Sequence, residues 1–411
     1  METFSQDSLA ALLMAPNETL PLQPQPPPSQ IVNDKISQYA TEKLKYPLKL
    51  NLENTFFDTL LSPVEEMRRM LSRSLQEKVT IWGIPLLKDN RTDVVLLKFL
   101  KARDFQVDEA FDMLRKTIVW RKEFNVDKLV MMSENDVENV MLIHGKDKEG
   151  SLVFYCNMMF IDKENLLRCW IQLLEKSIRK LDFSPVGNTT LLQVIDVKNF
   201  SGCGFNELRI ATTQTLQDNY PQLVTKQVFI NIPGWYMGFH KMISPILSKR
   251  TKEKFAFASA SESAETLLNN ISPEHLPIQF GGLSNNNFDE DNKEFTNKDP
   301  ATLITLKSRC KQAIEILVNH NERCLIRWEL RVVGWEVKYC AEYVPRDECA
   351  YSIIVQKARK IFPSDEQVIS SCFYTGCDCE GKMVLTIDNP TSNNKKVIYR
   401  SKVTLCHDNV R

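Results

Sequence analysis

One segment of the chain, residues 219–257, limits the possible fold more than any other. Residues 227–232 are apolar and β-branched, and Pro221 and Pro233 bound them, which is typical of a short buried strand. An apolar helix pattern follows, then a basic turn, and then a second apolar run that includes Phe257. Two buried strands joined by a helix predict a largely parallel sheet with helical crossovers.

The helix of this segment has a wide apolar stripe, and a cluster of cations follows it. Pro245 lies inside the stripe, where it removes a backbone hydrogen bond and should kink the helix. The stripe comprises Phe239, Met242, Ile243, Ile246 and Leu247, and the cations are Lys249, Arg250, Lys252 and Lys254. An interrupted apolar helix beside positive charge suits a ligand with a hydrocarbon body and an anionic head, as in a phospholipid.

Simpler interpretations of both features remain open. Any helix that packs on a sheet shows a similar stripe, and a short basic run is often an ordinary solvated turn. Lys254 adds weight to the binding interpretation because it adjoins a strand. If that strand points the right way, Lys254 lies at the edge where open α/β sheets bind ligands.

The composition indicates a folded protein of two or three domains, because 411 residues exceed one ordinary core. A content of 43% apolar and 25% charged residues is typical of soluble globular proteins. The net charge of zero argues against nucleic-acid binding, so any recognition of anions must be local. No uncharged apolar run approaches the ~20 residues of a membrane span. The first residues lack a basic segment, which predicts a cytoplasmic protein without a secretory signal.

The eleven cysteines are expected to be reduced thiols. Cys372, Cys377 and Cys379, with Cys406 and His407 later, lack the paired spacing of a zinc site. We therefore expect a thiol-bearing hairpin, no metal and no cofactor.

The first part of the chain divides into a tail and a helical module. Residues 1–60 show little periodicity and contain a proline-rich tract, so we expect a disordered tail. Ser62, Pro63 and Glu65 form the pattern of a helix start. Three helices are then predicted within residues 62–125, which would form a small all-α module.

The remainder predicts two further domains. Between 135 and 284, strands alternate with helices, which is typical of an α/β domain with a mainly parallel sheet. Residues 285–295 are polar and charged and should form a linker. Residues 296–408 contain about seven short strands, some alternating between apolar and polar residues, which favours an all-β sandwich.

The signatures of nucleophilic catalysis are missing from the sequence. The histidines are scattered, and no Gly-x-Ser-x-Gly elbow occurs. The segment 201–204 is neither a phosphate-binding loop nor a complete dinucleotide fingerprint. Asp196 ends a buried strand, where capping a loop is the favoured role and orienting a ligand is the alternative. The sequence therefore predicts a protein that is not an enzyme.

Several motifs resemble known families. FLKARDF (99–105), the strand–helix–strand block and LPIQFGG (276–282) are similar to the CRAL-TRIO lipid-transfer domain. WELRVVGWEVKYCAEY (328–343), VQKARK (355–360) and VLTIDNPTS (384–392) resemble a GOLD β-sandwich. A CRAL-TRIO domain followed by a GOLD domain resembles the patellin family of plants, and the likeness extends to IWGIPLL (81–87) and GGLS (281–284).

The resemblance implies a lipid pocket between the sheet and a mobile gate helix. The gate would fall on about residues 235–247, beginning with Trp235, so that the apolar stripe faces the acyl chains. The headgroup site of the family would fall on Arg103, Gln222, Thr251 and Lys254, and Lys249, Arg250 and Lys252 would face the membrane. Gln222 stands where phosphatidylinositol-binding members carry an acid, and Leu223 and Asp104 stand where they carry bases. The resemblance therefore implies retained phosphate contacts and an altered inositol side.

These features lead to two hypotheses from different classes. In the first, the chain is a non-enzymatic phosphoinositide-binding and transfer protein. It would associate peripherally with the plasma membrane or cell plate and act in membrane trafficking, including cell-plate formation in cell division. Its GOLD domain would bind trafficking proteins or membrane, with Lys395, Lys396, Arg400 and Lys402 as candidate contacts. In the second, the lipid pocket is vestigial, and the chain is an adaptor that works through its GOLD domain and proline tract.

Overall fold

The computed structural model describes residues 54–74, 79–87, 89–131, 141–157, 166–184, 187–198, 205–243, 253–285, 295–319, 322–334, 336–347, 349–362, 367–376 and 380–406. At 54–61, 141, 166, 205–209 and 239–243 it describes the backbone alone. None of the helices in these ranges has the length and apolar character needed to span a bilayer.

The N-terminal module is helical, as predicted. It contains α3 (Asn54–Ser74), α4 (Thr92–Ala102), α5 (Val107–Glu123) and α6 (Val126–Met131), with a hairpin of β1 (Thr80–Ile81) and β2 (Ile84–Pro85). The turn of the hairpin buries Trp82, which stacks on Phe99 and Tyr220 at ring-centroid distances of 5.9 and 6.5 Å. These ring contacts fix the module against the domain that follows.

The expected helix start at Ser62 is wrong. The helix α3 begins at Asn54, so Pro63 lies inside it. A proline within a helix removes one backbone hydrogen bond, and here the residues before it, NTFFDTLLS, continue the same helix. The expectation of a disordered tail therefore fails for residues 54–60, whereas residues 1–53 lie outside the described residues.

A five-stranded sheet forms the second domain. It contains β3 (Met141–Lys146), β4 (Leu152–Asn157), β5 (Leu191–Asp196), β6 (Val224–Ile232) and β7 (Phe255–Ser259), in the spatial order β3-β4-β5-β6-β7. The strands β4 to β7 are parallel, and β3 pairs antiparallel to β4 at the edge. The predicted mainly parallel sheet is confirmed, with an edge strand that the sequence interpretation missed.

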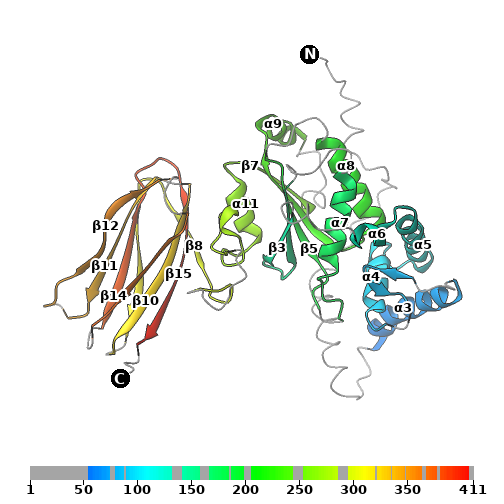
Figure 1. Cartoon of the computed structure of the whole chain (residues 1–411), viewed down its shortest axis with the longest axis horizontal. Coiled ribbons are helices and arrows are strands. Elements are labelled where there is room, and N and C mark those ends of the chain that lie inside the picture. Colours follow the sequence, from blue (N-terminus) through cyan, green and yellow to red (C-terminus); the bar gives the residue numbers. More distant parts are fainter. Residues whose placement is uncertain are drawn as a thin grey trace, which may run out of the picture. The chain divides into compact units, whose positions relative to one another are not determined.

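The two faces of this sheet are covered by different helices. Figure 1 shows α7 (Leu166–Ile178) and α8 (Phe205–Asn219) on one side and α11 (Ser263–Asn270) on the other. Phe154, Ile195 and Phe229 point to the first side and join one core with the N-terminal module. The opposite side packs on α11 through alternate residues of the same strands, which include Val153, Tyr155, Val194, Val228 and Ile230. Because successive strand residues alternate between faces, both faces are apolar, as a doubly covered sheet requires.

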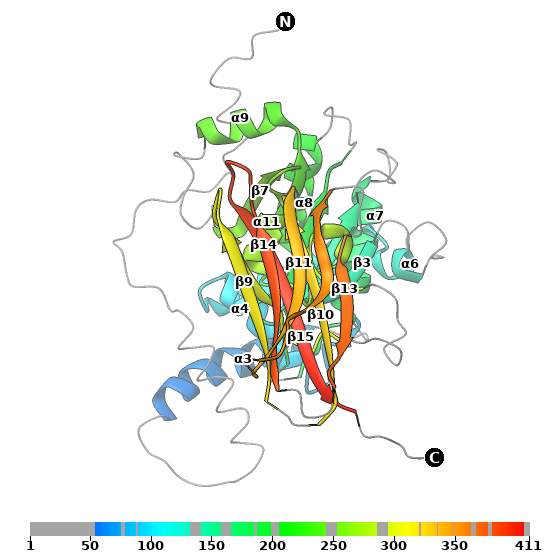
Figure 2. The same ribbon diagram turned by 90° about the vertical axis from the view of Figure 1, so that its left-hand side faces the viewer.

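The C-terminal domain is a sandwich of two antiparallel four-stranded sheets, with orders β13-β10-β15-β8 and β12-β11-β14-β9. The long strands run alongside one another in Figure 2. Their bounds are β8 (Thr302–Leu306), β9 (Lys311–Val318), β10 (Cys324–Val333), β11 (Val337–Pro345), β12 (Ile353–Ile361), β13 (Ile369–Tyr374), β14 (Gly381–Asp388) and β15 (Lys395–Leu405). Trp328 and Tyr339 lie in the core between the sheets and share a 2.8 Å hydrogen bond, donated by the indole nitrogen. The predicted sandwich is confirmed, and β13 is a strand that the sequence did not reveal.

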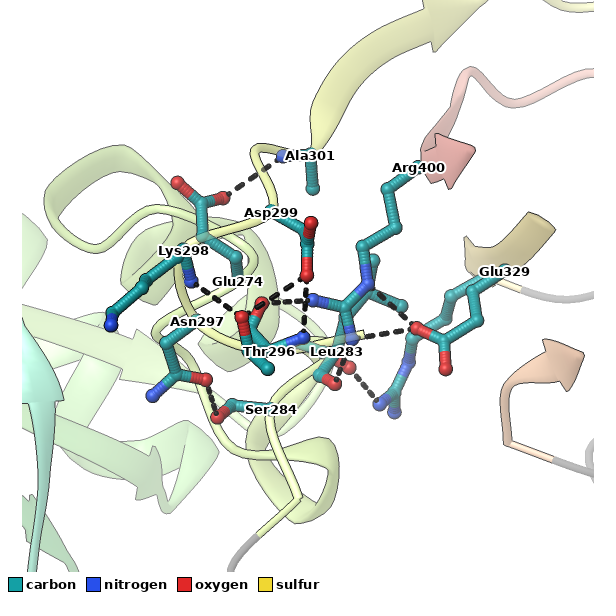
Figure 3. A network of polar contacts seen from close by, with 12 residues as sticks. Glu274, Leu283, Ser284, Thr296, Asn297, Lys298, Asp299, Ala301, Glu329 and Arg400 are labelled. Atoms are coloured by element: carbon teal, nitrogen blue, oxygen red, sulfur yellow. Dashed lines mark hydrogen bonds and ion pairs between the residues drawn. The ribbon is translucent and has the colours of Figure 1, made fainter. Parts of the chain in front are cut away.

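The outer face of the sheet β13-β10-β15-β8 packs on the α/β domain. Ile398 of β15 joins the core around α11, and Arg400 donates hydrogen bonds to the carbonyls of Thr296 and Leu283. Figure 3 shows this network, in which Glu329 is the carboxylate partner of Arg400 at 2.7 Å. The sandwich therefore binds the end of the α/β domain through buried polar contacts.

Burial corrects the expected surface role of two of the β15 cations. Arg400 is 5% exposed and Lys395 is 8% exposed, and the Lys395 ammonium donates a hydrogen bond to the carbonyl of Gly334. Lys396 pairs with Glu265 at 3.3 Å, and Lys402 pairs with Asp299 at 3.6 Å. Burial therefore argues against a surface role for Arg400 and Lys395, whereas the expected role of Lys396 and Lys402, which keep 27% and 49% exposure of their side chains, stays a prediction.

Candidate functional site

The helix α9 (Gly234–Ile243) begins directly after the buried strand β6. Both views place α9 beyond the carboxyl-terminal edge of the sheet (Figures 1 and 2). Because β6 and β7 are parallel, the chain between them must return from the carboxyl to the amino edge of the sheet. Tyr236 and Met237 pack into the core on the face that carries α7 and α8. The return therefore starts on that face.

An aromatic surface lies under the start of α9. Phe229 of β6 stacks on Phe257 of β7 at 5.1 Å, and Phe255 follows at 6.5 Å from Phe257. The ring of Tyr236 in α9 meets Phe257 at 5.8 Å, and both Phe255 and Phe257 remain half-buried. Half-buried rings on an edge strand of the sheet, close to a short helix, are suited to contact hydrocarbon chains.

Trp235 lies on the solvent-exposed side of α9. It is 59% exposed and meets Tyr236 edge to face at 5.7 Å. An exposed indole beside a buried tyrosine gives this helix one apolar surface toward solvent and another toward the sheet. Of the other expected gate residues, Phe239, Met242 and Ile243 lie in α9, where only the backbone is described, and Ile246 and Leu247 lie outside the described residues.

Two of the expected headgroup residues lie at the amino-terminal edge of the sheet. Gln222 precedes β6 and Lys254 precedes β7, and both are exposed. The condition for placing Lys254 at the carboxyl edge is not met, since β7 runs parallel to β6 and begins after Lys254. At the carboxyl edge, Asp196 accepts a hydrogen bond from the backbone nitrogen of Lys198 at 2.9 Å, which confirms its predicted capping role.

Arg103 follows the end of α4, which the structure brings to the same edge. Its guanidinium is half-buried and donates to the carbonyl of Ala102 at 3.3 Å. Ala102 packs in the same hydrophobic cluster as Val224 and Phe255, the first residues of β6 and β7. Thr251, Lys249, Arg250 and Lys252 lie outside the described residues, so their expected roles stay predictions.

Lys98 ties α4 to this edge, and the sequence gave no sign of it. Its ammonium donates hydrogen bonds of 2.9 Å to the carbonyls of Thr189 and Gln222, and the residue is 5% exposed. Burial lowers the pKa of Lys98 to about 7, and the nearby charge of Lys101 acts in the same direction. Gln222 itself has a positive φ of 56°, a left-handed conformation in a tight turn. The backbone of this candidate headgroup residue is thus held by a buried cation.

A second feature that sequence reasoning missed is a polar pair within the apolar sheet face. Gln227 of β6 donates a 2.7 Å hydrogen bond to the side-chain oxygen of Gln193 in β5. Gln193 is fully buried, and its amide nitrogen has no hydrogen-bond partner among the described residues. An unsatisfied buried amide in this position can donate to a polar atom of a ligand that enters the space under α9.

The core next to the headgroup edge contains a buried ion pair. Arg121 of α5 donates to both oxygens of Glu175 in α7, and the hydroxyl of Tyr220 donates to the same carboxylate at 2.8 Å. Burial raises the pKa of Tyr220 well above its ordinary value, with the negative charge of Glu175 acting in the same direction. These contacts join the helical module to α7 and to the turn that leads to Gln222.

No group of three or more His, Cys, Asp or Glu side chains in the described ranges could hold a metal ion. Of the cysteine cluster considered above, Cys372 is exposed and Cys406 is half-buried, whereas Cys377, Cys379 and His407 lie outside the described residues.

Comparison with known proteins matches each of the three folded regions to a known domain family. Residues 50–116 match the CRAL/TRIO N-terminal domain, residues 136–282 match the CRAL/TRIO domain, and residues 307–396 match the C-terminal GOLD domain of Patellin-1-like proteins. Patellin-3 of Arabidopsis thaliana is 45% identical over 392 residues, which span 91% of this chain and 79% of that protein. The chain belongs to the patellin family.

Other relatives include a longer patellin and a more distantly related lipid-transfer protein. Patellin-5 of Arabidopsis thaliana is 50% identical over 84% of this chain, but the chain spans only 54% of Patellin-5. The phosphatidylinositol transfer protein SFH5 of Kluyveromyces lactis is 26% identical over 210 residues, which span 46% of this chain and 68% of that protein. The predicted resemblance to CRAL-TRIO and GOLD domains in the patellin order is therefore confirmed.

Proposed function

We propose that this patellin binds a phospholipid between the sheet and α9 and transfers it between membranes without catalysing a reaction. The observation that carries the proposal is the aromatic surface of the half-buried Phe255 and Phe257, stacked beside the buried Phe229, under a helix that exposes Trp235. Each methylene group that leaves water for such a surface contributes about 0.8 kcal/mol. Since a bilayer offers nearly the same environment, transfer is close to balanced, and headgroup contacts decide which lipid is carried.

The headgroup is proposed to be an anionic one, such as a phosphoinositide. Arg103 and Lys254 would form charge-assisted hydrogen bonds with phosphate, and Gln222 and Thr251 would donate to phosphate or inositol oxygens. The relative SFH5 is named a phosphatidylinositol transfer protein, which supports this class of ligand. Gln193 would donate its unused amide hydrogen atoms to the glycerol or ester region of the lipid.

Movement of the gate helix α9 away from the sheet would expose apolar surface. This opening should therefore occur at a membrane. The basic residues Lys249, Arg250 and Lys252 would face the anionic leaflet there. Each cation would contribute about 1 kcal/mol of binding free energy. Action in membrane trafficking and in cell-plate formation, on the plasma membrane or the cell plate, remains part of the proposal.

The GOLD domain is proposed to meet membrane or partner proteins through its edge strand β12. Tyr351 is 92% exposed and Ile354 is 67% exposed, and the exposed cations Lys357, Arg359 and Lys360 follow along the strand. An edge strand with exposed apolar and basic residues is open both to a protein strand and to an anionic surface.

A second candidate function is an adaptor with an empty lipid site. Leu223 favours it, because this residue is fully buried in the core and cannot replace the basic residue that lipid-binding relatives are expected to carry there. The adaptor would act through the GOLD domain and the proline tract.

One experiment separates the two functions. The purified chain is extracted with organic solvent, and the co-purifying lipids are identified by mass spectrometry for the wild type, Arg103→Ala and Lys254→Ala. Lys338→Ala, an exposed cation of β11, is the control. A phospholipid at near one per chain that falls in both site variants supports transfer. A protein without lipid, or a lipid content unaffected by either change, supports the adaptor.

A further inference from the structure

A separate cavity lies where the α/β domain meets the sandwich. It has a volume of about 420 Å³ and is lined by the start of α11, by the short helix η3 (Ile278–Phe280) and by the end of β10. Ile230 of β6 also lines it, and this side chain points to the face of the sheet opposite to Phe229. The cavity is therefore distinct from the proposed lipid site, and its volume is that of a small-molecule pocket.

Among the described residues that line this cavity, Arg331 is the one that carries a charge. The residue is 8% exposed, and one terminal nitrogen donates to the carbonyls of Ile278 and Gly282 at 2.5 and 2.8 Å. Burial lowers the pKa of Arg331 to about 10, so the guanidinium stays protonated at neutral pH. No carboxylate among the described residues forms an ion pair with Arg331.

The neighbouring Arg400 has a carboxylate partner, and Arg331 differs from it in this respect. Both arginines extend from the outer face of the same sheet and donate to carbonyls of the segment 278–283. Arg400 is paired with Glu329 at 2.7 Å, whereas Arg331 meets only carbonyls in the part of the chain that the structure describes. A buried cation without a counter-charge is unfavourable, and an anion that enters the cavity would relieve it.

The remaining lining residues suit an anionic group on an apolar body. Asn231, Ser261, Ser263 and Gln279 are polar, and no aspartate or glutamate is among the lining residues. The first turn of α11 also begins at the cavity, and the backbone N–H groups of a first helical turn favour anions. Leu267, Phe280 and Val332 supply the apolar part.

The acidic residues nearby have partners of their own. Asp196 accepts a 2.7 Å hydrogen bond from the side chain of Asn231, and Glu265 pairs with Lys396 at 3.3 Å. Glu262 accepts a 2.7 Å hydrogen bond from the hydroxyl of Ser259. These contacts leave the guanidinium of Arg331 as the uncompensated charge of the cavity.

We propose that this cavity binds a small molecule in which a phosphate or carboxylate group is attached to an apolar body, with Arg331 as the counter-charge. The anionic group would meet Arg331 and the first turn of α11, and the apolar body would lie against Phe280 and Leu267. The ligand would touch Asn231, which lies on β6 shortly before α9 begins at Gly234. A soluble metabolite could thus bind at the strand that leads into the gate helix.

The test uses the full chain and phenyl phosphate as the probe in isothermal titration calorimetry. Saturable binding with one site per chain is expected, with inorganic phosphate at least ten-fold weaker and benzyl alcohol without binding. Arg331→Gln should weaken phenyl phosphate binding at least ten-fold, which corresponds to about 1.4 kcal/mol.

A second variant keeps the test decisive if Arg331→Gln does not fold. Ala260 is exposed and lines the cavity, so Ala260→Trp should fill it and abolish binding, whereas Ala358→Trp on the exposed part of β12 should not change binding. The proposal is overturned if the wild type shows no saturable binding, if Ala260→Trp binds as well as the wild type, or if inorganic phosphate binds as tightly as phenyl phosphate. The same variants should retain any co-purifying lipid, which separates this site from the lipid site.

Discussion

The ammonium group of Lys98 donates a 2.9 Å hydrogen bond to the backbone carbonyl of Gln222. This contact joins α4 of the helical module to the tight turn that precedes β6. Since Gln222 is an expected headgroup residue, the position of its side chain depends on a cation buried beneath the turn. The same ammonium group also holds the carbonyl of Thr189 at the start of the neighbouring strand, so it fixes two turns of one edge.

The first prediction concerns the pH dependence of Lys98. Burial lowers the pKa of Lys98 to about 7 in the folded chain, below the ordinary value of 10.5 that it should regain on unfolding. Between these values the unfolded chain binds more protons than the folded one, so the contribution of Lys98 to stability rises with pH. Below pH 7 Lys98 is protonated in both the folded and the unfolded chain. The destabilisation that results from burying its charge is then at its maximum and no longer changes with pH.

Lys98→Met should therefore change the slope of stability against pH. Urea midpoints measured from pH 6.5 to 9.5 should rise less with pH in Lys98→Met than in the wild type. Lys338→Met, an exposed lysine of β11, should follow the wild type. Parallel curves for Lys98→Met and the wild type would mean that Lys98 keeps an ordinary pKa in the fold.

The buried pair of Arg121 and Glu175 gives a second prediction. Glu175→Gln removes the charge that compensates Arg121, whose side chain is 4% exposed, and should destabilise the fold by about 3–5 kcal/mol. Asp127→Asn is the matched control, because Asp127 pairs with the same arginine at 3.4 Å but is 54% exposed, and it should change stability by about 1 kcal/mol or less. Calorimetric unfolding of both variants measures the difference. Equal losses would show that burial of Glu175 has no special effect.

Most of the fold could be predicted because burial leaves a strong pattern in the sequence. The strands β5 and β6 are apolar runs bounded by turn residues, and both were located to within a few residues. The edge strands β3 and β13 were missed, since a strand that is covered on one side only shows a weaker pattern. The start of α3 was missed because Ser62 and Pro63 match the sequence pattern of a helix N-terminus, although they lie inside a continuous helix.

The site was less predictable because its decisive contacts join residues far apart in the sequence. Lys98 and Gln193 sit within apolar runs, but nothing in those runs tells which carbonyl or amide will meet them. Arg400 was expected on the surface as a candidate contact and Arg331 was not singled out, because the sequence pattern of a strand does not reveal that another domain covers its outer face. Single-sequence patterns thus predict which side of an element is buried locally and miss burial between domains.

A third prediction follows from the unsatisfied amide of Gln193. Replacing both Gln193 and Gln227 by leucine removes a buried polar pair that has one unpaired group, so the lipid-free protein should become more stable by about 1–3 kcal/mol. The double variant should also lose selectivity among phospholipids that differ near the glycerol, because no protein donor remains there. Thermal unfolding of delipidated protein and a competition assay with mixed vesicles measure the two effects. A less stable double variant would show that the pair is satisfied in the native fold.

The last prediction concerns the coupling of the two domains by Arg400. Arg400→Met removes donors from the carboxylate of Glu329 and from the carbonyls of Thr296 and Leu283 (Figure 3). The loss of three contacts around a side chain that is 4% exposed should destabilise the junction by roughly 2–5 kcal/mol. Differential scanning calorimetry should then show the sandwich and the α/β domain unfolding in separate transitions.

A neighbouring lysine provides the control for Arg400. Lys402 is 49% exposed and pairs with Asp299 at 3.6 Å, so Lys402→Met should change stability by about 1 kcal/mol or less and leave the transitions as in the wild type. If Arg400→Met and Lys402→Met give the same thermogram, Arg400 does not couple the domains. The apolar contact of Ile398 with the core around α11 would then be the stronger link between them.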